Sequence, residues 1–187
     1  MRFAFTPQMK KRITRRVVRM LDESAQHFPE LQDRVMTVGY TKTKAGVALI
    51  PLQADVPLHI RLHVRGLNYN TIGHEMTHLI QGVSRFPGAL GSAFTEPLPG
   101  GETQCDIWTL ARSDLFCDEA PVYLKLPGSV RDRWRDHAGV VRRLCIEAIQ
   151  MRPNHRTYIR WLESQIMSLP ALTRSDSQEP HQFTLPL

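Results

Sequence analysis

The chain has 187 residues, of which 42% are hydrophobic, and a formal net charge of +6 at pH 7. This length is sufficient for one compact domain with a sizeable core. No run approaches the roughly 20 consecutive apolar residues that cross a bilayer, and the N-terminus lacks the apolar segment of a secretory signal. We therefore expect a cytoplasmic protein with no membrane partner.

The first 21 residues are rich in arginine and contain no acidic residue. Thr6 is suited to cap a helix and Pro7 to open it, and apolar residues recur behind them at helical spacing. We predict a helix over residues 7–27 that packs on the core and carries a basic outer face. The composition also fits an organelle transit peptide, although Asp22 and Glu23 continue the helical pattern.

Three short runs rich in Val, Ile, Leu and Tyr follow, at residues 34–41, 45–52 and 58–65. Turn-forming residues separate them, so we predict three strands of a small sheet. The third run alternates, with apolar residues on one face and basic residues and histidines on the other. We expect His59 and His63 to be surface groups rather than metal ligands. If this strand lines the cleft, its free edge can pair with an extended peptide.

The most informative motif is the pentapeptide His-Glu-Met-Thr-His at residues 74–78, within a predicted helix over residues 68–82 that ends at its final glycine. Side chains four residues apart share one face of a helix, so His74 and His78 can hold a single Zn²⁺. Glu75 can act as general base towards a water molecule there. The alternative is an ordinary core helix whose polar side chains are hydrogen-bonded or solvated.

A second pair of acidic residues lies downstream, on a predicted helix over residues 101–114. Catalytic zinc sites usually have three protein ligands, and Glu102 is the best-placed oxygen donor for the third position. Asp106, four residues later, can accept the free ring N–H of a histidine ligand. The alternative is a solvated acidic face, in which Glu102 is favoured by the helix dipole.

The sequence contains three cysteines and no C-x-x-C pair, which indicates a reducing compartment. Cys105 is adjacent to Asp106 in the sequence, but neighbouring residues face different sides of a helix. We expect Cys105 to be a small buried side chain rather than a ligand or a nucleophile.

The H-E-x-x-H motif with a downstream E-x-x-x-D resembles the gluzincin branch of the zincin metallopeptidases, the thermolysin-like proteins. The resemblance spans residues 35–115. It implies an α+β zincin-like fold, in which a small twisted sheet with its edge strand beside the substrate cleft precedes the metal helix and the glutamate helix. It also implies that His74, His78 and Glu102 are the zinc ligands. In the same way it implies that Glu75 is the general base and that Asp106 supports a histidine ligand. The metzincin branch requires a glycine and a third histidine where this chain has Gln81 and Ser84.

Thermolysin-like enzymes also use a tyrosine or histidine to stabilise the oxyanion, and no motif identifies this residue here. The candidates are Tyr123, His137, His155 and Tyr158. Tyr123 is the expected donor because it follows Asp106 most closely. The Gly- and Pro-rich segment 83–100 connects the two motifs, and we expect it to form a lid over the cleft.

The C-terminal third predicts two further helices within residues 129–168. The first is capped by Ser129 and ends before Pro153, and the second begins at about residue 154. Residues 173–187 are polar and contain prolines, so we predict a mobile tail behind a single catalytic domain over residues 1–172.

These patterns, together with the resemblance to gluzincins, predict a zinc-dependent metallopeptidase that binds one Zn²⁺ and acts on a peptide or protein. The alternative is a catalytically inactive zincin-fold module that binds an acidic partner or nucleic acid through basic residues near the N-terminus and in residues 131–160. A general base beside intact ligands favours the enzyme.

Overall fold

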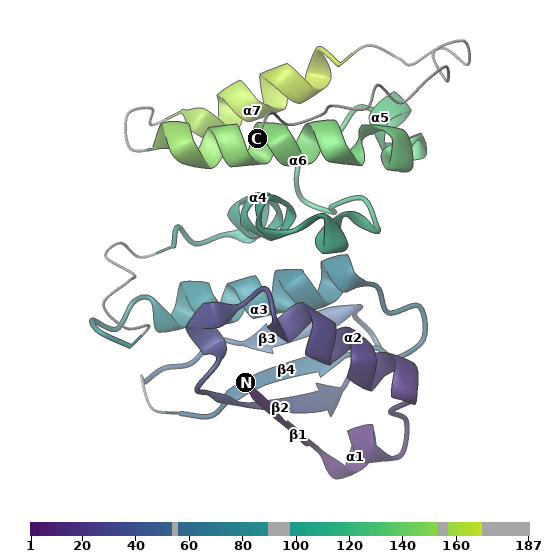
Figure 1. Ribbon diagram of the computed structural model, residues 1–187, viewed down its shortest axis with the longest axis vertical. Helices are drawn as coiled ribbons and strands as arrows, with labels where there is room; N and C mark the ends of the chain where they lie inside the picture. Colours follow the sequence, from purple (N-terminus) through teal and green to yellow (C-terminus); the bar gives the residue numbers. More distant parts are fainter. Residues whose placement is uncertain (54–55, 90–97, 153–156, 170–187) are drawn as a thin grey trace, which may run out of the picture.

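The computed structural model describes residues 1–53, 56–89, 98–152 and 157–169 (Figure 1). A four-stranded mixed sheet near the N-terminus precedes most of the helices, which makes the fold α+β. The strands are β1 (Arg2–Phe5), β2 (Val35–Tyr40), β3 (Gly46–Leu49) and β4 (Leu58–Leu62). The α-helices are α1 (Pro7–Lys10), α2 (Arg15–Ala25), α3 (Tyr69–Val83), α4 (Glu102–Arg112), α5 (Gly128–Asp132), α6 (Trp134–Met151) and α7 (Tyr158–Met167). Short 3-10 helices in the described part of the chain include η1 (Pro29–Leu31) and η2 (Asp114–Cys117).

The sheet has the strand order β1-β2-β4-β3. Strands β1, β2 and β4 are parallel, and β3 is antiparallel to β4. The three predicted strands are present, but β1 was not predicted because it is short and its side chains are only partly buried. The expectation of a free edge on the third predicted strand is wrong, since β4 pairs with β2 on one side and β3 on the other. The edge strand on this side of the sheet is β3.

The predicted helix over residues 7–27 is interrupted. Residues between α1 and α2 leave the helical conformation, and the hydroxyl of Thr14 accepts a hydrogen bond from the backbone N–H of Val17 at 3.3 Å. A threonine that caps a new helix competes with continuation of the preceding one. Both helices nevertheless bury the predicted apolar stripe against the sheet core, through Met9, Val17, Met20 and Leu21.

Backbone N–H groups at the N-terminus of α3, the helix that carries the H-E-x-x-H motif, have side-chain hydrogen-bond acceptors. The side chain of Asn68 accepts a hydrogen bond from the N–H of Thr71 at 2.7 Å, and the carboxylate of Asp118 accepts from the N–H groups of Tyr69 and Asn70. These hydrogen bonds satisfy backbone N–H groups in the first turn of α3, which have no acceptor inside the helix. The predicted end at Gly82 is wrong by one residue, and Gly82 has a packing role. A Cβ atom there would lie 2.8 Å from the ring of Pro51.

Helix α4 lies between α3 and α6, so it joins two hydrophobic cores (Figure 1). One core contains the sheet, α2 and α3, and the other lies between α4 and the layer formed by α5, α6 and α7. The predicted helix from Ser129 to residue 151 is divided at Arg133, where the backbone is not helical. The buried indole of Trp134 donates to the carbonyl of Cys117 at 2.7 Å, which fixes the start of α6.

Helix α7 lies within the predicted range of 154–168, whereas the predicted tail at residues 173–187 lies outside the described residues. Within the described ranges, none of the helices combines the length and the apolarity needed to span a bilayer.

Candidate metal site

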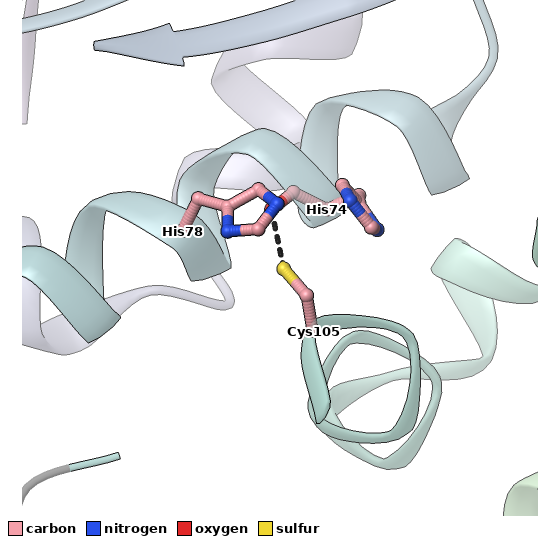
Figure 2. Close-up of side chains that lie close together, drawn as sticks. All are labelled: His74, His78 and Cys105. Carbon is pink, nitrogen blue, oxygen red and sulfur yellow. Dashed lines mark hydrogen bonds between the residues drawn. The ribbon is translucent and has the colours of Figure 1, made fainter. Parts of the chain in front are cut away.

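The two motif histidines project from the side of α3 that faces α4 (Figure 2). Their ring centroids are 4.7 Å apart, and the side chains of His74 and His78 are 11% and 15% exposed. The helical spacing of four residues therefore produces the shared face that the sequence predicts. The face opens onto a pocket instead of into the core.

Glu102 lies opposite the two histidines. Its Oε2 atom is 3.0 Å from Nε2 of His74 and 3.0 Å from Nε2 of His78. Gly101, which precedes it, has a φ of 108°, a conformation that side-chain-bearing residues rarely adopt, so glycine permits the turn into α4. Ligand atoms of a tetrahedral zinc site lie about 3.3 Å apart, as follows from metal–ligand distances of about 2.0–2.1 Å. Both distances from Glu102 Oε2 to the histidine nitrogens are close to this spacing.

His74 lies between two carboxylates. Its Nδ1 atom is 2.8 Å from Oδ1 of Asp106, while Nε2 faces Glu102. A neutral imidazole has only one N–H, so it cannot donate to both carboxylates. Burial lowers the pKa of His74, but the hydrogen bond and charge of Asp106, together with Glu75 and Glu102, outweigh it and raise the pKa. The position is therefore suited to a cation, either a second proton or a metal ion at Nε2.

The carboxylate oxygen of Asp106 that does not face His74 is held by backbone N–H groups. Its Oδ2 atom accepts hydrogen bonds from the N–H groups of Tyr123 and Leu124, at 2.6 and 2.8 Å, and its side chain is 1% exposed. Both carboxylate oxygens are thus engaged, and the carboxylate cannot rotate without losing a bond. This arrangement fixes the proton of His74 on Nδ1 and leaves Nε2 free to coordinate.

His78 has a partner that the sequence did not reveal. Its Nδ1 atom is 2.9 Å from Oε1 of Gln81, three residues later on α3. In the sequence, the identity of Gln81 only excludes the metzincin pattern. The spacing of three residues between His78 and Gln81, which places them on one face of a helix, could have identified this partner.

Cys105 is a second candidate for the third ligand. Ligand atoms of His74, His78 and Cys105 all lie within 4.8 Å of one another, so these residues form a group able to hold a metal ion. The thiol is buried and donates a hydrogen bond to the carbonyl oxygen of His74 at 3.0 Å (Figure 2). Burial raises the pKa of this thiol well above its ordinary value. A thiolate ligand would have to lose both the proton and the hydrogen bond.

Glu75 lines the same pocket and is 7% exposed. Burial raises the pKa of its carboxyl group, although the charges of His74 and His78 and a hydrogen bond from the backbone of Ala48 oppose the shift. Strand β3 packs directly against it, because a Cβ atom on Gly46 would lie 2.6 Å from Cγ and Oε1 of Glu75. The edge strand and the motif helix together hold this carboxyl group in place.

The pocket has a volume of about 490 Å³ and lies between β3, α3, the start of α4 and residues 122–123. Tyr123 lines it, is 49% exposed, and stacks on the ring of His74 with a centroid distance of 5.7 Å. Two other oxyanion candidates lie elsewhere: His137 is buried on α6, and the hydroxyl of Tyr158 donates to Gln104. His155 and the middle of the predicted lid, residues 90–97, lie outside the described residues.

The structure thus brings together every residue that the sequence assigned to the site, and adds Gln81 and the backbone of β3. Comparison of the chain with models of protein families, with curated proteins and with solved structures gives no match.

Proposed function

We propose that this protein is a zinc-dependent metallopeptidase of the gluzincin type. The observation that carries the proposal is the convergence of His74 Nε2, His78 Nε2 and Glu102 Oε2 beside the buried carboxyl group of Glu75. Two imidazole nitrogens and one carboxylate form a ligand set typical of catalytic zinc. The order of sheet, motif helix and glutamate helix agrees with the fold that the resemblance implies.

The ligand set fits a metal ion because the surrounding hydrogen bonds direct both Nε2 lone pairs towards Glu102. Asp106 accepts the Nδ1 proton of His74, and the amide oxygen of Gln81 accepts that of His78. Zn²⁺ in such a site lowers the pKa of a water molecule towards 7 and polarises a substrate carbonyl.

Glu75 is the proposed general base. Burial raises the pKa of its carboxyl group and so increases its affinity for a proton, which suits it to take a proton from water in the pocket and deliver it to the leaving amine. The N–H of Ala48 holds the carboxylate in place during this transfer. Tyr123, stacked on His74 at the pocket wall, is the proposed donor to the oxyanion that develops on the substrate.

The substrate class follows from the edge strand. Gly46, Val47 and Ala48 of β3 line the pocket, and β3 is the last strand of the sheet on this side. An extended peptide can add to a free strand edge through main-chain hydrogen bonds. A bond placed beside Glu75 in this way would be a peptide bond.

The isosteric variant Glu75→Gln tests the reaction. We expect it to retain one zinc ion per chain and to lose about 10²- to 10⁴-fold in the rate of peptide cleavage, because it removes the base but none of the ligands. Metal content by elemental mass spectrometry and cleavage of a peptide library measure the two effects. A variant that cleaves as fast as wild type would show the mechanism to be wrong.

Glu102→Ala and Cys105→Ala together test the ligand set. We expect Glu102→Ala to lose most of the zinc and Cys105→Ala to retain it, because only Glu102 faces both Nε2 atoms. The opposite pattern would assign the third position to the cysteine and remove the gluzincin assignment.

A further inference from the structure

We infer that Gln81 is a positioning residue that couples the second metal-binding histidine to the segment preceding Glu102. The inference rests on the metal site proposed above. It assigns a role to a residue that none of the sequence motifs indicates.

The orientation of the Gln81 amide is determined by a backbone carbonyl. Gln81 is 3% exposed, and its Nε2 atom donates to the carbonyl oxygen of Pro99 at 2.7 Å and to that of Gly101 at 3.4 Å. A carbonyl oxygen can only accept, so the NH₂ group must face these residues and Oε1 must face His78. The Nδ1 atom of His78, 2.9 Å from Oε1, must then carry the proton. This tautomer leaves the lone pair on Nε2, which faces Glu102.

The same end of α3 holds the segment that leads into α4. Ser84 accepts a hydrogen bond from the N–H of Leu98 at 3.2 Å and donates to the carbonyl oxygen of Gln81 at 3.1 Å. Leu98 is buried in the core that contains α3. Residues 98–101, immediately before Glu102, are thus fixed to the last turn of α3. The Gln81 amide therefore helps to position two of the proposed ligands, His78 and Glu102.

A neutral amide suits this position electrostatically. The site already contains the carboxyl groups of Glu75, Glu102 and Asp106. A carboxylate at position 81 would accept from His78 equally well, but it would add negative charge and would repel the carbonyl oxygen of Pro99. Gln81 therefore supports His78 by a hydrogen bond alone, whereas Asp106 supports His74 with a charge.

Two variants separate the two contacts. Gln81→Met is similar in volume and removes both, whereas Gln81→Glu keeps the acceptor for His78 and loses the donor to Pro99. Zinc affinity is measured by competition with a chelator. Limited proteolysis at residues 98–101, which we call the clamped segment, reports on whether these residues remain attached to α3. The matched control is Gln150→Met, which makes the same change at an exposed position on α6.

We expect Gln81→Met to weaken zinc binding by about 10- to 100-fold, the usual effect of removing a partner of a ligand histidine. Gln81→Glu is expected to retain more of the affinity than Gln81→Met, yet to be cleaved faster than wild type in the clamped segment. The control is expected to match wild type in both measurements.

Zinc affinity in Gln81→Met equal to that of wild type would overturn the inference and leave the proposed function intact. A wild-type chain that binds no zinc would overturn both. If Gln81→Met does not fold, Gln81→Glu decides: proteolysis of the segment at the wild-type rate overturns the inference, and faster proteolysis supports it.

Discussion

Asp106 is buried, and both of its carboxylate oxygens are hydrogen-bonded. Its two oxygens accept three hydrogen bonds, from His74 and from the N–H groups of Tyr123 and Leu124. The variant Asp106→Asn replaces one acceptor by an NH₂ group, which must face either the histidine or the backbone donors. We expect zinc affinity to fall about tenfold or more and the melting temperature to fall as well, since a buried donor loses its partner.

Calorimetry and chelator competition measure these two effects. Asp132→Asn, an exposed position on α5, is the matched control. An Asp106→Asn variant with the zinc affinity of wild type would show that the carboxylate does not support the metal site.

The cysteines are expected to be unreactive in the folded protein. Burial raises the pKa of Cys117 to about 11, and the pKa values of Cys105 and Cys145 are also raised by burial. At pH 8 a thiol with a pKa of about 11 is ionised to about 0.1%, compared with about a quarter for an ordinary cysteine. We expect a thiol reagent to modify Cys117 about 10²-fold more slowly in the native state than in denaturant. Rapid modification of Cys117 in the native state would contradict the raised pKa of its thiol.

The raised pKa of Cys117 also has a consequence for stability. The folded state keeps the thiol proton to a higher pH than the unfolded state does. The free energy of unfolding should therefore fall as pH rises from about 9 towards 11. Denaturant titrations of wild type and of Cys117→Ala across this range measure the contribution. A difference between the two proteins that stays constant with pH would argue against it.

At the scale of elements, two helical glycines have opposite surroundings. A Cβ atom on Gly73 of α3 would lie 2.6 Å from the ring of Phe116 and 2.8 Å from Thr109 of α4. A Cβ atom on Gly139 of α6 would meet nothing within 4 Å. We expect Gly73→Ala to destabilise the protein by about 1–3 kcal/mol through overpacking, and Gly139→Ala to stabilise it by about 0.5–1 kcal/mol through helix propensity.

Denaturant unfolding of both alanine variants measures the difference between these two glycines. The chemical change is identical, so each variant is the control for the other. Equal effects would show that contact between α3 and α4 is looser than the structure indicates.

Strand β3 illustrates how an element acquires a role from its neighbours. Both β3 and β4 are expected as strands from their sequences, but β4 is paired on both sides and β3 on one. Side-chain alternation predicts that a run is a strand, and it does not report which edge remains open. The edge that faces the pocket could be assigned only after strand pairing was known.

At the scale of the whole molecule, α4 links the two cores and makes them mutually dependent. Ile107 and Leu110 of α4 belong to the helical core, whereas Trp108 packs against the sheet core. We expect a single cooperative unfolding transition, because loss of either core exposes one face of α4. The fluorescence of Trp134 on α6 and Trp161 on α7 reports on the helical core, whereas that of Trp108 on α4 reports on the contact of α4 with the sheet core.

Far-ultraviolet circular dichroism reports on the whole chain, including the sheet lobe, by which we mean the sheet with α2 and α3. Coincident midpoints for circular dichroism and fluorescence would support coupling of the two cores. Two separated midpoints would show that the sheet lobe and the helical layer unfold independently.

The basic residues are distributed over separate layers. Helix α2, which carries Arg15, Arg16 and Arg19, packs in the sheet lobe beside α3, whereas α6, with Arg135 and Arg143, packs beyond α4 (Figure 1). Electrostatic binding of nucleic acid uses basic residues that cluster on one face. These two basic helices belong to different layers of the described part of the chain.

The sequence by itself determined the features that depend on residues close together in the chain. These include the helical face shared by His74 and His78, the cap formed by Thr6, the approximate bounds of β2, β3 and β4, and the Glu102–Asp106 spacing. Each reflects a helical or strand period or a local hydrogen bond, so short-range spacing is sufficient to predict it.

The tertiary structure alone decided the contacts between distant segments. Asp118 caps α3 across 49 residues, Gln81 binds Pro99 across 18, and the backbone of Tyr123 holds Asp106 across 17. Strand β1 was likewise identified only by its pairing with β2. The sequence lists the groups able to make these contacts, but which of them meet depends on how the cores pack, and local patterns carry no information about that packing.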